Sequence, residues 1–423
     1  MRDHELRLVL NDELHGRPGL PVTSPSRITH LAFTLAEGDG DPLINVKQLC
    51  NALGVKPPAG GAPHHAAEID SGIFKYERHG EFYRISVTVS GNGGRSEAIA
   101  VLPLGWVDDL PGKRLVAIHT HILAKAAKPP TVSLLKTLFG ESELACSLVC
   151  QGEATVWTDF RIGTDGFTRM LIHEHGMAPL RLGRISRRLH EIETYRMMAL
   201  LAFPLARQLQ NELRPLENAL ADTIAAMLSA SGTDEDAILL SRLSSIARDV
   251  EAMSNRSSYR FAAARAYAAL VAKRVAELGE MRVMSAQRLG VYLDRRFSPA
   301  MATCNAVAER IASLAQRCER ASNLLRTRVD IALEGHNQQL LRSMETRARQ
   351  QLMLQETVEG LSVVAISYYV IGIVAKLIDG LAAYAPGIDS KFLSLLSIPA
   401  VVILVWLAVR RLRNRVHRAA KNA

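Results

Sequence analysis

Two long apolar stretches near the end of the sequence constrain the possible folds more than any other feature. They span 360–378, GLSVVAISYYVIGIVAKLI, and 392–409, FLSLLSIPAVVILVWLAV. At about 1.5 Å per helical residue, roughly nineteen residues reach across the roughly 30 Å hydrocarbon core of a bilayer. Because each stretch carries almost no charge, we expect a hairpin of two transmembrane helices rather than a pair of buried core helices.

Positive charge is distributed unevenly around this hairpin. The short connecting loop, 379–391, carries only Asp379, Asp389 and Lys391, whereas arginines precede the first stretch and a basic tail, 410–423, follows the second. By the positive-inside rule both flanks are cytoplasmic and the loop is external. The first residues lack the apolar segment of a secretory signal. We therefore expect both termini and the bulk of the chain in the cytoplasm.

The basic tail holds much of the excess positive charge of the chain. Lysine and arginine number 51 against 42 acidic residues, a net charge of +9. Basic residues directly beside a membrane attract anionic lipid headgroups. The tail residues that we expect to do so are Arg410, Arg411, Arg413 and Arg415. Since the tail accounts for the charge, a nucleic-acid partner is not expected.

Residues 1–176 show an apolar period of two, which is typical of strands. The predicted strands span 28–35, 72–77, 82–89, 114–123, 143–149, 154–159 and 167–174, and the predicted helices span 42–53 and 132–139. Tight-turn sequences at 78–81 and 163–166 favour antiparallel neighbours. The predicted fold class is an α+β domain with a mixed, largely antiparallel sheet covered by helices. A Pro/Gly/Ala-rich stretch, 57–67, is predicted to be a flexible loop.

Residues 177–297 change to a period of 3.6 and are predicted to form a helical layer without strands. Pro204 and Pro215 predict kinks or breaks. Ser298 followed by Pro299 is typical of a helix start, because Ser caps the helix and Pro suits its first position. We expect a long stalk helix over 298–359 that leads into the first apolar stretch.

The stalk carries an apolar seam with heptad-like spacing. Its members are Val307, Ile311, Leu314, Cys318, Ala321, Leu325, Val329 and Ala332. Such a seam must pack against a partner. Both the preceding helices of the same chain and copies in a homo-oligomer could supply one, and Gly335 is where a break in the helix would be expected.

Candidate metal ligands occur as two histidine pairs on predicted strands. His119 and His121, like His173 and His175, lie two residues apart, so each pair projects from one sheet face. Four imidazoles could bind a divalent transition metal if the strands were adjacent. The alternative is a set of ordinary surface or hydrogen-bonded histidines, which the lack of a characteristic ligand spacing favours.

Other chemistry-bearing patterns are sparse. No nucleophile elbow, zinc-protease motif or paired catalytic signature is present, so no catalytic residue is predicted and the chain is not expected to be an enzyme. The five cysteines include no C-x-x-C pair and are expected to be free thiols. In the first apolar stretch, Ser367, Tyr368 and Tyr369 lie mid-span and should face another helix, while Lys376 can extend towards the headgroups.

Three motifs together identify a family resemblance. They are ELHGRP at 13–18, ETYRMMAL at 193–200 and QLMLQETVEGLSVVAISYY at 351–369. With them the chain resembles the bacterial membrane-anchored family catalogued as domain of unknown function 3422, which implies a location at the bacterial inner membrane and no assigned activity. The first motif contributes Glu13, Leu14, His15, Arg17 and Pro18.

The order of regions is also similar to that of the CorA-type magnesium channels, whose pentamers line a pore with the first span. That similarity implies a homo-oligomer here. The Gly-Met-Asn signature after the first span is absent, however, because residues 377–384 are LIDGLAAY. The leading hypothesis is therefore a non-enzymatic, homo-oligomeric scaffold or sensor. The alternatives are a divergent CorA-like ion channel or transporter and, third, a metal- or nucleotide-dependent cytoplasmic activity; ligand, conducted ion and protein partners are not predicted.

Overall fold

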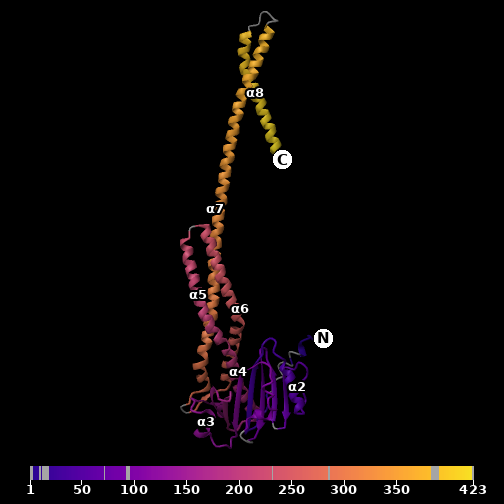
Figure 1. The fold of residues 1–423 in the computed structure, drawn as a ribbon, viewed down its shortest axis with the longest axis vertical. Helices are drawn as coiled ribbons and strands as arrows, with labels where there is room; N and C mark the ends of the chain where they lie inside the picture. The colour runs from indigo at the N-terminus through magenta and orange to yellow at the C-terminus, as the bar shows by residue number, and fades with distance from the viewer. Residues whose placement is uncertain are drawn as a thin grey trace. The chain divides into compact units, whose positions relative to one another are not determined.

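The computed structural model describes residues 3–8, 11, 19–70, 72–91, 96–230, 232–283, 286–382 and 390–421. The chain divides into two compact units, Met1–Asn323 and Leu324–Ala423, here called unit 1 and unit 2. Figure 1 shows the elements of both. Each unit is described by itself.

Unit 1 contains a nine-stranded sheet in the order β2-β3-β4-β1-β5-β8-β7-β6-β9. The strands are β1 (Ser26–Thr34), β2 (His64–Ile69), β3 (Gly72–Arg78), β4 (Phe82–Ser90), β5 (Lys113–Leu123), β6 (Ala145–Val149), β7 (Ala154–Ile162), β8 (Thr168–Glu174) and β9 (Met281–Arg282). Neighbours are antiparallel except β5 and β8, which are parallel. The predicted mixed, largely antiparallel sheet is confirmed.

Two parts of the sheet differ from the sequence prediction. The stretch expected to be a flexible loop holds β2, in which His64 pairs with Glu77 of β3. The helical region was expected to lack strands, yet β9 pairs with β6. Both are edge strands, which depend on backbone pairing with a neighbour more than on an apolar pattern of their own, so the period-two signal missed them.

One face of the sheet, called the α2 face, carries an apolar core. Helix α2 (Pro42–Ala52) covers it, beginning with Asp41, whose side chain accepts a hydrogen bond from the Leu43 backbone N–H. The buried core side chains here include Leu31, Phe33, Leu49, Phe74, Tyr76, Tyr83 and Ile85. The short helices η1 (Ala98–Val101), α3 (Val132–Phe139) and η2 (Cys150–Gly152) lie between strands along the chain.

The opposite face, called the α4 face, contacts helix α4 (Pro179–Leu200), which also packs against α6 (Thr233–Glu277). Between them in sequence lies α5 (Ala202–Ser229). The helix is interrupted between Leu200, where α4 ends, and Ala202, where α5 begins. This break lies just before Pro204, as expected, whereas Pro215 lies inside α5 without ending it. Of the five cysteines, all are free and four are buried, with Cys150 partly exposed.

Helix α7 is assigned over Leu289–Ala382. The predicted start at Ser298 is therefore wrong by about nine residues, and Pro299 lies inside the helix. The upstream turns bury Leu289, Leu293 and Phe297, and this burial outweighs the local start signal of Ser-Pro.

Within unit 1 the apolar seam of α7 is buried by helices of the same chain. The seam residues from Val307 to Ala321 are at most 5% exposed. Arg310 of α7 forms a salt bridge of 2.8 Å with Glu217 of α5. This part of the seam therefore has an intramolecular partner.

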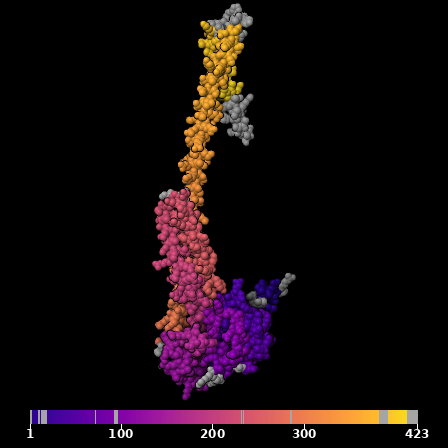
Figure 2. Space-filling model, viewed as in Figure 1, coloured from indigo at the N-terminus to yellow at the C-terminus, as the bar shows by residue number. Residues whose placement is uncertain are grey.

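Unit 2 contains the rest of α7, which is helical through Gly335, and helix α8 (Ser390–Lys421). Both have segments long and apolar enough to cross a membrane. Side chains from 333 to 358 are all exposed, and Figure 2 shows the orange part of the chain as a narrow column of atoms. Residues 379–382 of the predicted loop are helical, and 383–389 lie outside the described residues.

Candidate functional site

Charged side chains are gathered in the interior of unit 1, between the α4 face of the sheet and α4. Strand register sets Glu77 of β3 directly opposite Arg84 of β4, and Lys75 opposite Ser86. His30 of β1 also pairs with Ser86, so all these residues project from the same face. On α4, positions 187, 190, 191 and 194 share one helical face. We call Lys75, Glu77, Arg84, Arg187, Glu191, Arg274, His30 and His190 the buried charge cluster.

Glu77 is the sheet-side carboxylate of the buried charge cluster. Its Oε2 accepts a hydrogen bond of 2.6 Å from Arg84 Nε, and its Oε1 lies 3.1 Å from Lys75 Nζ. Both Glu77 and Arg84 are 3% exposed. Burial by itself would raise the pKa of Glu77, but Arg84 and Lys75 outweigh it and lower the pKa to about 2. Glu77 is therefore ionised at neutral pH.

Glu191 is the helix-side carboxylate and is 2% exposed. Three arginines from three elements surround it. Arg187 of α4 lies at 2.7 Å, Arg274 of α6 at 2.6 Å and Arg84 of β4 at 3.4 Å. Burial opposes its ionisation, yet Arg84 and Arg187 lower its pKa below the ordinary value. One carboxylate thus links the sheet, α4 and α6.

His30 and His190 stack beside these charges, with ring centroids 4.7 Å apart. His30 bonds to Ser86 at 2.8 Å and to Thr194 at 3.2 Å, and His190 Nε2 bonds to Thr120 at 2.8 Å. Burial is the main cause that lowers the pKa of both rings, that of His190 to about 3. Nearby positive charge acts in the same direction, so both imidazoles are neutral at pH 7.

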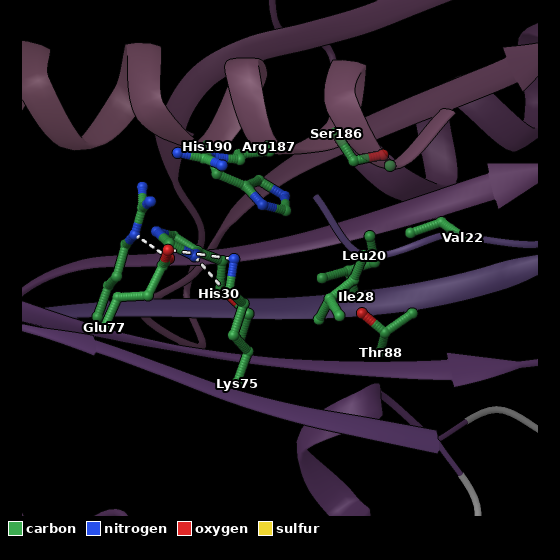
Figure 3. Close-up of a pocket in the computed structure, with 13 residues that line it drawn as sticks. Leu20, Val22, Ile28, His30, Lys75, Glu77, Thr88, Ser186, Arg187 and His190 are labelled. Carbon is green, nitrogen blue, oxygen red and sulfur yellow. Dashed lines mark hydrogen bonds and ion pairs between the residues drawn. The ribbon is translucent and has the colours of Figure 1, made fainter. Parts of the chain in front are cut away.

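A cavity of about 60 Å³ lies within this arrangement. Figure 3 shows its lining, in which Glu77, Lys75 and His30 approach from the strands and Ser186, Arg187 and His190 from α4. Leu20, Val22, Ile28 and Thr88 line the other side. The cavity therefore has one charged wall and one largely apolar wall.

The titrating groups of the cluster limit the chemistry that it can perform. A general acid or base works best when its pKa lies near the operating pH. Here Glu77 and Glu191 have lowered pKa values and remain ionised, while His30 and His190 remain neutral. The arrangement is suited to holding charge in fixed positions rather than to moving a proton at neutral pH.

The predicted metal-binding histidines lie on the other side of the sheet, the α2 face. Strands β5 and β8 are adjacent, as the prediction required, but His121 pairs with Leu171 and His173 with Leu123. His119 lies 3.7 Å and His121 3.0 Å from Glu97. Among the described residues, no group of three or more histidine, cysteine or acidic side chains is placed to hold a metal ion.

The second histidine pair is held by neighbours within the sheet. The rings of His173 and His175 contact edge to face at 4.8 Å. His175 Nε2 bonds to Thr155 at 2.9 Å. Burial lowers the pKa of His175. His173 thus lies in β8 and His175 directly follows it, next to Thr155 of β7.

The remaining predicted site residues fall in unit 2 or outside the described residues. Glu13, Leu14, His15, Arg17 and Pro18 are outside them. Ser367 is buried, whereas Tyr368, Tyr369 and Lys376 are exposed. Arg410 lies over the Trp406 ring at 4.9 Å, and Arg411 is exposed. Arg413 and Arg415 belong to α8, but their side chains are not described.

The sequence prediction missed the buried charge cluster. A partial signal existed in β3, where Lys75 and Glu77 alternate with the large apolar side chains of Phe74 and Tyr76. In an antiparallel sheet such alternation indicates one solvated face. Another signal was the polar face of α4, which carries His190 and Glu191. Nothing in either pattern indicates that the two polar faces cover each other.

Comparisons with known proteins agree in part with the sequence interpretation. A family model described as "Protein of unknown function (DUF3422)" matches residues 2–416. No curated protein matches the chain. Among solved structures, a match titled "structure of the full-length CmaX protein" shares 13% identity and covers 71% of this chain and 94% of that chain, with a TM-score of 0.15. A TM-score of 0.15 is too low to indicate a shared fold. The CorA-like architecture that the order of regions in the sequence suggests therefore stays a prediction.

Proposed function

The chain belongs to the DUF3422 family of proteins of unknown function, and from that premise we propose that it is a membrane-anchored, non-enzymatic scaffold or sensor. Unit 2 would hold it in the inner membrane of a bacterium by two spans, and unit 1 would work in the cytoplasm. The proposal further makes the protein a homo-oligomer.

The exposed apolar side chains of unit 2 carry this proposal. Leu361 is 72% exposed, Val364 66% and Leu404 68%, and they lie on two separate helices. A water-soluble protein rarely exposes so many large apolar side chains contiguously. Hydrocarbon is the solvent that such a surface suits, and the basic residues at the end of α8 support a cytoplasmic placement of both ends.

Two adjacent tyrosines support the homo-oligomer. Tyr368 is 76% and Tyr369 72% exposed in the first span. Neither hydroxyl has a hydrogen-bond partner among the described residues. A hydroxyl without a partner is costly in hydrocarbon, and a helix of another copy would supply one.

A pore-lining first span is the second candidate, because Ser367, Tyr368 and Tyr369 put three hydroxyls mid-span. Consecutive residues are about 100° apart around a helix, so three in a row cover about 200° and cannot all face one central axis. This geometry suits contacts between helices better than a uniform polar pore. We therefore keep the scaffold or sensor as the leading proposal.

A topology and assembly measurement tests the proposal. C-terminal fusions to a fluorescent protein and to alkaline phosphatase should give fluorescence without phosphatase activity, because both ends are expected in the cytoplasm. Light scattering of the purified full chain in mild detergent should give a multiple of the 46.4 kDa monomer. A protein that stays in the soluble fraction would contradict the anchor, and ion flux in liposomes would favour the channel.

A further inference from the structure

The cavity beside the buried charge cluster has room for a small solute. It encloses about 60 Å³. Since one water-sized sphere needs roughly 10–15 Å³ of such space, this corresponds to about four to six spheres. A molecule of about five non-hydrogen atoms fits this space.

The cavity lining is richer in positive than in negative charge. Lys75, Arg84 and Arg187 line it, against the single carboxylate of Glu77. Glu191 lies behind, paired with Arg187 and Arg274. Because His30 and His190 are neutral at pH 7, they add donors and acceptors without adding charge. An anion that enters would meet three cations in a medium that screens charge poorly.

Polar side chains line the cavity on several sides. Ser86 and Thr88 of β4 and Ser186 of α4 contribute hydroxyl groups, of which Ser86 is paired with His30 and Ser186 donates to the Leu182 backbone oxygen. His190 is 4% exposed, and its Nε2 bonds to Thr120. Its other ring nitrogen, Nδ1, has no hydrogen-bond partner among the described residues. A deeply buried imidazole in the cavity lining thus keeps one nitrogen available for a ligand.

We propose that this cavity binds a small tetrahedral oxyanion of the phosphate or sulfate type, held by Arg187, Lys75 and Arg84 and by His190 Nδ1–H. The proposal puts the imidazole proton on Nδ1, so that Nδ1–H donates to the ligand while Nε2 accepts from Thr120. Guanidinium groups match the geometry of such oxyanions. The inference rests on the proposed sensor function and names the ligand class that the cytoplasmic unit would sense.

An oxyanion in this place would contact the sheet and α4 at once. Lys75 and Arg84 belong to β3 and β4, whereas Arg187 and His190 belong to α4. Binding to the folded state alone stabilises it. Ligand occupancy should therefore raise the thermal stability of unit 1.

Calorimetric titration of the purified full chain with sodium phosphate, at pH 7 and constant ionic strength, tests the inference. The expected result is saturable binding, together with a melting temperature that rises with phosphate and not with equivalent chloride. A parallel titration with sulfate shows whether the site distinguishes the two oxyanions, and binding of either supports the proposal. Absence of saturable binding by both, up to about ten millimolar, overturns it.

Neighbouring arginines of α4 provide a matched pair of variants. Arg187 lines the cavity, whereas Arg188 pairs with Glu277 at 3.1 Å and does not. Their side chains are 33% and 30% exposed. Since a charged hydrogen bond contributes about 1.5–3 kcal/mol, Arg187→Gln should weaken binding by about ten-fold or more, and Arg188→Gln should leave it unchanged. Equal loss in both variants would show non-specific attraction and overturn the site.

Further controls keep the result interpretable. If Arg187→Gln does not fold, judged by circular dichroism, Lys75→Gln serves as the second variant and should also weaken binding. Membrane fractionation separates this inference from the proposed function. A soluble protein that binds phosphate would contradict the anchor alone, and an anchored protein without phosphate binding would contradict the ligand alone.

Discussion

The two units distribute charged and apolar side chains in opposite ways. Unit 1 encloses Arg84 and Glu191 at 3% and 2% exposure, among neutral histidines and a packed apolar core. Unit 2 turns its apolar side chains outward, as Leu361 and Leu404 show at 72% and 68%. In unit 1, the buried charges of Arg84 and Glu191 are tolerated because each has an oppositely charged partner, whereas the outward apolar side chains of unit 2 suit an apolar solvent. The difference indicates that each unit is built for its own surroundings.

The largest predicted effect comes from removing the central cation of unit 1. Arg84→Met leaves Glu77 with Lys75 alone and takes one of three arginines from Glu191. Breaking a buried pair by removing one partner costs about 3–5 kcal/mol of unfolding free energy. Urea denaturation of the purified chain, followed by fluorescence of Trp106 and Trp157 in unit 1, measures it.

Exposed pairs provide the control for Arg84. Arg78 pairs with Asp41 at 3.1 Å, but the two side chains are 46% and 44% exposed. Arg78→Met should therefore cost no more than about 1 kcal/mol. Adding Glu77→Gln to Arg84→Met should recover part of the loss, since it removes a charge left with a single cation. Equal effects of Arg84→Met and Arg78→Met would contradict the structural role of buried charge in unit 1.

The second effect concerns the outward apolar face of unit 2. Leu404→Arg puts a charge in the second apolar segment, where insertion of arginine costs about 2.5–3.5 kcal/mol. The variant should lose much of its membrane fraction, measured by carbonate extraction and immunoblotting. Leu340→Arg is the matched control, because Leu340 is 61% exposed on α7 outside both apolar segments. Similar extraction of both variants would contradict the membrane span.

Helical glycines of the two units should respond in opposite directions to the same substitution. A Cβ on Gly183 of α4 would lie 2.0 Å from the backbone oxygen of Leu20, whereas one on Gly335 of α7 meets nothing within 4 Å. Gly183→Ala should therefore destabilise unit 1 by about 1–3 kcal/mol through overpacking. Gly335→Ala should stabilise its helix by about 0.8–1 kcal/mol. Thermal denaturation followed by circular dichroism compares them, and loss of stability in both would contradict the open surroundings of Gly335.

Much of the sheet could be predicted because its signals are local. In the segment from Phe82 to Ser90, apolar residues alternate after a tight turn, and the strand formed where expected. The start of α7 could not be predicted, because Ser298 and Pro299 give a strong local signal that burial of Leu293 and Phe297 overrides. Edge strand β2 was missed since its stability comes from pairing with β3.

The candidate site was less predictable than the fold. Lys75, Glu77 and Arg84 look like the solvated face of an antiparallel sheet. Only the packing of α4, about a hundred residues later, buries them, and sequence periodicity contains no information about which faces meet. The histidine pairs, by contrast, have a local pattern that suggests metal ligands, yet register sets His121 opposite Leu171 and not opposite another histidine.

The last predicted effect is a pH dependence of the stability of unit 1. His190 is neutral in the folded protein because burial, with Arg84 nearby, lowers its pKa to about 3, whereas in the unfolded chain it has the ordinary value of 6.5. Below pH 6.5 only the unfolded state gains the proton, so stability is complete above that pH and falls as the pH decreases towards 3. The contribution is about 1.4 kcal/mol per pH unit.

Urea denaturation between pH 7 and pH 5.5, in buffers free of phosphate and sulfate, measures this dependence. His190→Gln retains a partner for Thr120 and removes the proton site, so its unfolding free energy should fall less steeply with decreasing pH, by up to about 1.4 kcal/mol per unit at the acid end of this range. His336→Gln, which removes an exposed imidazole from α7 in unit 2, should leave the slope unchanged. An equally steep slope in His190→Gln would mean that protonation of His190 in the unfolded chain does not cause the acid sensitivity of unit 1.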